Sequence, residues 1–191
     1  MKFPSILVSG LSLMLALSAG NLYADDQKPA IPEHEEHGPH EHGTGKLGIA
    51  QDGTKLEISL DSPGMNLFGF EYMPKSDADK KVVADAEAKL WVGANLFALD
   101  ADAGCKQTAA TLSNAAEKPD AAEAAADKGE AHSDVEVSWT FTCEKPEALQ
   151  TVTTKLFSTF SGFHKLNAEW VTDKGASAVE LEKDDTIKLT P

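Results

Sequence analysis

The stretch "KLGIAQDGTKLEISLDS", residues 46–62, decides the fold. Apolar and polar residues alternate on both sides of Asp52-Gly53, so each half is predicted to be a strand with one apolar face. An Asp-Gly pair supplies the positive φ of a tight hairpin turn. Every second residue from Leu56 to Leu60 is apolar. The stretch therefore predicts an antiparallel hairpin with one face packed on a core.

Alternation returns further along the chain. Strands are predicted within 133–144, 149–157, 165–182 and 186–190, the last of which closes the sheet. The third of these stretches turns at Asp173-Lys174-Gly175. The apolar residues 62–76 are predicted to be a loop that covers the core, and a short irregular strand is predicted near Cys105.

One helix is predicted, from Ser76 to Trp91. Ser76 and Asp79 resemble a capping box at its start. The apolar stripe of this helix is predicted to contain Val82, Val83, Ala86 and Leu90. The fold class is therefore α+β, an antiparallel β-sheet with one main amphipathic helix and a His-rich N-terminal arm.

The chain divides into segments of different composition. Residues 1–24 have a lysine, a short apolar run and small residues before Ala24, which is typical of a cleaved secretory signal. Residues 25–44 form a polar arm rich in His and Glu, and 45–191 a single domain. Within it, 114–131 is a low-complexity insert of alanine and charged residues, predicted to be solvated.

The charge balance excludes some classes of partner. The net charge is −14 at pH 7 and arginine is absent. Nucleic acids and anionic membranes both require cationic side chains, so neither is expected to bind. An acidic surface attracts cations, although solubility alone also explains it.

Cys105 and Cys143 are the only cysteines. An even pair in an exported chain predicts a disulfide. The alternative, two zinc thiolates, lacks a second cysteine or histidine at close spacing.

Four of the six histidines lie in "EHEEHGPHEHG", residues 33–43. His40 and His42 are two apart, so in an extended segment their imidazoles lie on one face and chelate one ion. His34 and His37 are secondary donors on the arm. Imidazole with carboxylate is a ligand set for Zn²⁺, and less exclusively for Ni²⁺ or Cu²⁺. The alternative is a polar tail that binds metal only as a purification tag does.

Two further histidines stand alone in the sequence. His132 precedes a strand on its polar face, where a capping or solvent-exposed histidine is the simpler interpretation. His164 lies between apolar residues and is interpreted as structural. Nucleophile-elbow, phosphate-loop, EF-hand, HExxH and haem motifs are absent from the sequence, so we do not expect an enzyme.

Several motifs together resemble the periplasmic zinc-binding proteins of the ZrgA type. They are "HEHG", the "SPGMNLFGFEY" block at 62–72, Cys105, "AHSDVEVSWTFTC" at 131–143 and "LFSTF" at 156–160. The resemblance covers nearly all of the chain after residue 24. Two features depart from the family pattern: Tyr72 stands where histidine often follows GFE, and the insert contains no histidine.

The resemblance implies a periplasmic protein that binds Zn²⁺ and supports zinc uptake beside an ABC-type importer. It implies metal ligands at His40 and His42 in HEHG, at His132 in the HSD block and, more weakly, at Glu71 in GFE. The alternative function is a structural or interaction domain of the cell envelope with an incidental His-rich arm.

Overall fold

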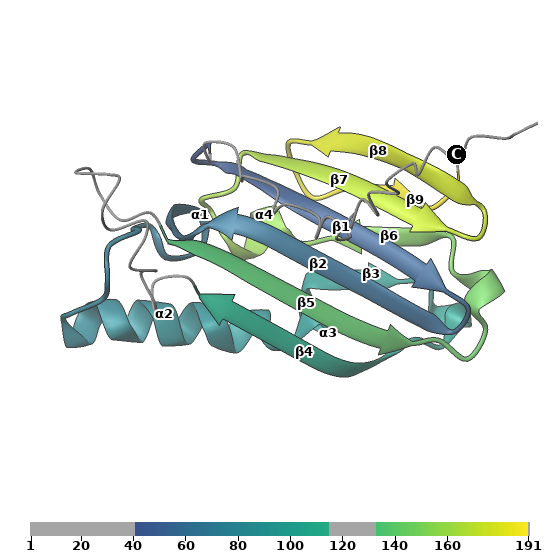
Figure 1. Cartoon of the computed structure of the whole chain (residues 1–191), viewed down its shortest axis with the longest axis horizontal. Helices are drawn as coiled ribbons and strands as arrows, with labels where there is room; N and C mark the ends of the chain where they lie inside the picture. Colours follow the sequence, from purple (N-terminus) through teal and green to yellow (C-terminus); the bar gives the residue numbers. More distant parts are fainter. Residues whose placement is uncertain (1–40, 115–132, 191) are drawn as a thin grey trace, which may run out of the picture. The chain divides into compact units, whose positions relative to one another are not determined.

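The predicted hairpin is the centre of the fold. In the computed structural model, which describes residues 41–114 and 133–190, strands β1 (Thr44–Asp52) and β2 (Lys55–Pro63) pair antiparallel (Figure 1). Asp52 pairs with Lys55, so the two loop residues are Gly53 and Thr54. Gly53 has φ +53°, and the turn therefore begins one residue later than an Asp-Gly turn would.

Six strands make up the large sheet, in the order β4-β5-β2-β1-β7-β8. Besides the hairpin strands β1 and β2, the sheet contains β4 (Lys106–Asn114), β5 (Asp134–Thr142), β7 (Lys165–Thr172) and β8 (Gly175–Leu181). Its strand pairs are antiparallel, as predicted, except that β1 runs parallel to β7. That one parallel pair joins the first described strand to a strand near the C-terminal end of the sequence.

A second sheet has three short strands, β3 (Phe97–Leu99), β6 (Thr151–Thr154) and β9 (Thr186–Lys188). The prediction that 186–190 closes the large sheet is wrong, because Ile187 pairs with Val152 of β6. Ile187 and Leu189 are 2% and 0% exposed. The edge strand β8 is exposed over most of its length, so pairing with it would leave these side chains in water.

The main helix, α2 (Asp77–Leu90), begins as predicted. The hydroxyl of Ser76 accepts a hydrogen bond from the Asp79 backbone N–H at 3.0 Å. Ala86 and Leu90 are buried, but Val82 is 42% exposed and does not belong to the stripe. A helix advances about 100° per residue, which places Val82 at the edge of the arc that contains Ala86, Leu90 and Val83, so Val82 lies at the solvent margin of the buried face.

Short helices occupy segments that were predicted as loop or strand. They are α1 (Gly64–Phe68), α3 (Gly93–Leu96), α4 (Leu156–Thr159), and the 3-10 turns η1 (Ala101–Ala103) and η4 (Pro146–Ala148). Residues 149–157 are thus a strand only over β6. The Asp184 carboxylate accepts hydrogen bonds from the N–H groups of Phe157 and Ser158, which satisfies the first turn of α4.

The core lies between the large sheet and the elements on one of its faces (Figure 1). Trp139 of β5 is fully buried and meets Phe97 of β3 edge-on, with ring centroids 5.1 Å apart. Its indole N–H donates to the Leu90 carbonyl at the end of α2. A Cβ at Gly93 would collide with the indole ring, so glycine is required there. This one side chain therefore joins the large sheet, the small sheet and two helices.

Cys105 and Cys143 form the predicted disulfide, which joins the chain before β4 to the end of β5. The two cysteines are therefore not a thiolate zinc site. Asn114, the first residue of the predicted insert, belongs to β4. Residues 115–131, the predicted signal 1–24 and the arm up to His40 lie outside the described residues. The described residues belong to one compact unit, and none of their helices has the length and apolar character of a membrane span.

Candidate functional site

One end of the large sheet gathers segments from distant parts of the sequence. Thr44 of β1 pairs with Lys165 of β7, and Pro63 of β2 pairs with Asp134 of β5. The residues before β1, β5 and β7 therefore lie at the same end of the sheet as those after β2. The HEHG motif, the GFE motif and the HSD motif are all connected to this end.

HEHG ends in a β-turn. The backbone N–H of Thr44 donates to the Glu41 carbonyl at 2.9 Å. Gly43, at the third position, has φ +88°, the value that a type II turn requires and that favours glycine. His42 occupies the second position, and its side chain is 53% exposed. The prediction of an extended segment is therefore not met at His42, because the strand begins only at Thr44.

Hydrogen bonds fix both the backbone N–H and the backbone carbonyl of Gly43. Its carbonyl accepts hydrogen bonds from the backbone N–H groups of His164 and Lys165, at 2.8 and 2.9 Å. Its own N–H donates to the Asn66 side-chain oxygen at 2.7 Å. A Cβ at Gly43 would also lie 2.7 Å from the ring of His164, so a larger residue would have to displace that ring and adopt a strained φ of +88°. These contacts therefore hold the backbone directly after His42 in one place.

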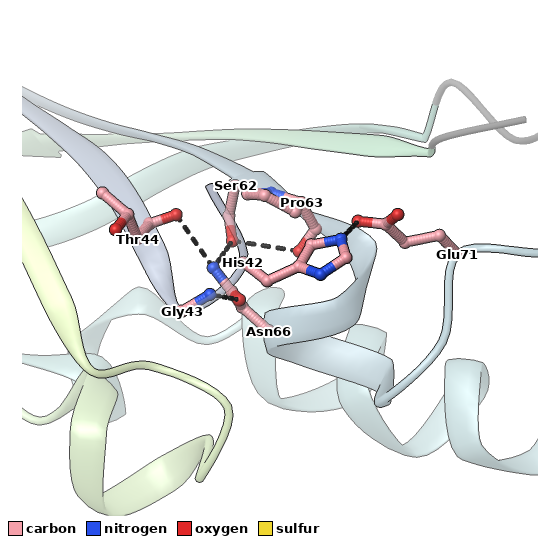
Figure 2. A network of polar contacts seen from close by, with 7 residues as sticks. All are labelled: His42, Gly43, Thr44, Ser62, Pro63, Asn66 and Glu71. Carbon is pink, nitrogen blue, oxygen red and sulfur yellow. Dashed lines mark hydrogen bonds and ion pairs between the residues drawn. The ribbon is translucent and has the colours of Figure 1, made fainter. Parts of the chain in front are cut away.

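Asn66 of α1 is the polar centre of this end of the sheet (Figure 2). It is 2% exposed. Besides accepting from Gly43, its amide nitrogen donates to the Thr44 carbonyl at 2.9 Å and to the Ser62 hydroxyl at 3.1 Å. Both ends of the amide are therefore satisfied, as a buried amide requires.

Glu71 reaches His42 from the segment that follows α1. The helix ends at Gly69, whose φ of +80° is a left-handed cap, and the chain then turns back. The Glu71 Oε1 lies 3.1 Å from the His42 Nε2, and the Glu71 side chain is only 10% exposed (Figure 2). A half-exposed imidazole and a nearly buried carboxylate are therefore in contact at this end of the large sheet.

This pair suits a zinc ion in type and spacing. Imidazole nitrogen and carboxylate oxygen bind Zn²⁺ at about 2.0–2.2 Å, so two ligands of a tetrahedral ion stand roughly 3.3 Å apart. The separation of 3.1 Å between Nε2 and Oε1 is that of an ion pair or hydrogen bond, and it is also close to the spacing of two zinc ligands, so an ion would take the place of the shared proton. Two donors do not complete a site, and no group of three or more His, Cys, Asp or Glu among residues 41–114 and 133–190 could hold a metal.

Of the predicted site residues, the structure describes only two. His42 and Glu71 come together, whereas the other predicted ligands, His34, His37, His40 and His132, lie outside the described residues. Ser133, the residue after His132, is 3% exposed, and its carbonyl accepts from the Gly64 N–H at 2.7 Å.

His164 is exposed, and it holds Gly43 through its backbone while its ring lies beside that glycine. Sequence reasoning did not assign a role to Asn66. The one available signal was a polar residue within the apolar block at 62–72.

The model of the ZrgA family of zinc uptake proteins matches residues 39–189. The chain belongs to this family. No curated protein matches the sequence. The matched range of the ZrgA family begins just before HEHG and includes GFE and HSD, so all three motifs at this end of the sheet lie within it. Membership of the ZrgA family assigns the protein a role in zinc uptake.

Proposed function

We propose that this protein binds Zn²⁺ in the periplasm and buffers it or hands it over to an uptake system, with His42 and Glu71 as two of the ligands. The contact of 3.1 Å between their side chains carries the proposal. The two residues belong to two different motifs, and the fold brings them together at one end of the sheet. The donor types and their spacing suit zinc.

His40 and His132 are our candidates for the remaining ligands. His40 is two residues before His42, and His132 directly precedes Ser133. Ser133 is held against Gly64 at the start of α1, the helix that leads to Glu71. With three imidazoles and one carboxylate, the ion would have the four ligands of a closed zinc site. His34 and His37 would add weaker sites on the arm.

The proposal also includes the location of the protein and the partner that receives the zinc ion. Residues 1–24 would direct export and be removed, and a zinc ABC importer would receive the ion. The net charge of −14 would raise the local concentration of divalent cations. Binding and release of zinc exchange coordinate bonds and require no covalent reaction of a substrate, so the protein would act without catalysis.

The test begins with untagged protein that lacks residues 1–24, dialysed against trace zinc and measured by elemental analysis. We expect about one tightly held zinc ion per chain. His40→Ala, His42→Ala and His132→Ala should each remove tight binding while circular dichroism stays unchanged. His164→Ala is the matched control, because His164 fixes Gly43 through its backbone N–H and not through its ring.

Three results would contradict the proposal at different levels. If the parent protein held no zinc tightly, the alternative function, a structural or interaction domain of the cell envelope, would be favoured. A His132→Ala protein that binds like the parent would remove the HSD motif from the site. A His42→Ala protein that binds like the parent would remove the described pair from it.

A further inference from the structure

Asn66 connects the two segments that carry His42 and Glu71. Through Gly43 and Thr44 it holds the turn that presents His42. It also lies in α1, five residues before Glu71 in the chain. A shift of Asn66 would therefore move one proposed ligand relative to the other.

The chemistry of these contacts calls for asparagine. The side chain accepts from a backbone N–H with Oδ1 and donates to a backbone carbonyl with Nδ2. Among side chains of this length, only an amide offers a fixed acceptor beside a fixed donor. Aspartate would place a second acceptor against the Thr44 carbonyl, and leucine would leave buried backbone groups without partners, which is costly.

The backbone of Asn66 is itself braced. A Cβ at Gly162, in the loop before β7, would fall 2.6 Å from the Asn66 Cα and 2.8 Å from its carbonyl carbon. Those atoms belong to the main chain and cannot rotate away. The loop that leads to His164 therefore presses on α1 while its next residues hold Gly43.

We propose that Asn66 is a positioning residue for zinc binding, which sets the distance between His42 and Glu71 before the ion arrives. This inference rests on the proposed function. An ion that meets ligands already in place does not have to order the turn, so part of the entropic cost of binding is removed. Partners that orient metal ligands typically change metal affinity by roughly 10–100-fold when they are lost.

The experiment compares Asn66→Asp with the matched control Ser62→Ala. Ser62 is equally buried, and its hydroxyl hydrogen-bonds the Asn66 amide and the Pro63 carbonyl, so its removal leaves both bonds from Asn66 to the turn in place. Zn²⁺ affinity is measured by competition with a chelator, stability by thermal melting, and the order of the turn by amide exchange of Gly43 in metal-free protein. Asn66→Ser, which leaves room for a bridging water, serves if the aspartate variant does not fold.

We expect Asn66→Asp to lower Zn²⁺ affinity by roughly 10–100-fold and to speed Gly43 exchange. Ser62→Ala should lower the affinity by much less than Asn66→Asp does, because the hydrogen bonds of Asn66 with Gly43 and Thr44 remain. Absorption spectra of both proteins saturated with Co²⁺ should keep the bands of the parent, because the ligands are unchanged.

Two results would overturn the inference. Zinc affinity equal to that of the parent, with faster Gly43 exchange, would make Asn66 purely structural. Equal affinity losses in Asn66→Asp and Ser62→Ala would attribute the effect to general loosening. Failure of the proposed function looks different: His42→Ala would then leave the zinc affinity of the parent unchanged, and both proposals would be rejected.

Discussion

Glu71→Gln tests the proposed site most directly, because the change keeps the size of a nearly buried side chain and removes its charge. Without metal, the effect on folding should be small. The partner imidazole of His42 is 53% exposed, and ion pairs with such exposed groups contribute about 0–1 kcal/mol. The melting temperature of the metal-free variant should therefore lie within about 4 °C of the parent.

With zinc, the difference should be large. A ligand present at 100 times its dissociation constant stabilises the folded state by about 2.7 kcal/mol. In a domain of this size that raises the melting temperature by roughly 5–10 °C. If the loss of the anionic oxygen weakens binding 100-fold, the same zinc concentration stabilises the variant by only about 0.4 kcal/mol, or roughly 1–2 °C.

The assay is a thermal melt of parent and variant with and without that zinc concentration. Glu57→Gln is the matched control, because it removes one carboxylate and its contact with Lys55 near the opposite end of β2. The control should keep the full zinc-induced increase. A Glu71→Gln protein with the same zinc-induced increase as the parent would refute the assignment of Glu71 as a ligand.

Three further predictions concern other parts of the molecule. Replacing Cys105 and Cys143 by serine should lower the free energy of unfolding by about 4 kcal/mol, since the bridge closes a loop with a sequence separation of 38 residues. Denaturant titration measures this free energy. A loss below about 1 kcal/mol would show that β4 and β5 need no cross-link. Burial raises the pKa of Asp100, but hydrogen bonds from Gln150 N–H, Thr151 N–H and the Thr151 hydroxyl, together with the charge of Lys174, hold it below its usual value. Because the folded-state pKa is lowered, this carboxylate stabilises the fold above its usual pKa, and the contribution is lost as the pH falls through the lowered folded-state pKa. Asp100→Ala should cost about 1–3 kcal/mol at pH 7, and urea titrations at decreasing acidic pH should show a progressively smaller cost. A cost that does not change with pH would contradict the role of the charge. His34→Ala combined with His37→Ala should reduce only weak zinc binding in a competition titration, because these residues lie further from β1 than His40 and His42; loss of the tightest binding event would reverse this ranking.

Periodicity predicted the elements whose side chains alternate between core and water. β1, β2, β5, β7 and the start of α2 follow directly from the pattern of apolar residues and the Ser76 cap. β8 is exposed over most of its length and follows instead from the predicted turn at Asp173-Lys174-Gly175. The short elements do not, because their causes lie far away in the chain. The first turn of α4 is capped by the Asp184 carboxylate, and β9 joins a separate sheet to bury Ile187.

The site was predictable in its residue types and not in its geometry. Family resemblance indicated His42 and Glu71, which the structure brings together. The type II turn at HEHG is consistent with the local sequence, since Gly43 meets its requirement for positive φ. Asn66 was out of reach, because its partners Gly43 and Thr44 lie more than twenty positions earlier and are backbone atoms.

The parallel pairing of β1 with β7 can form only after most of the chain has been synthesised. Synthesis delivers the HEHG segment early and the residues that clamp Gly43, His164 and Lys165, near the end of the chain. A nascent chain therefore carries His42 and Glu71 well before the contacts of His164 and Lys165 with Gly43 can form. The turn that presents His42 to Glu71 is fully supported only after residues 164 and 165 have emerged and β7 has paired with β1.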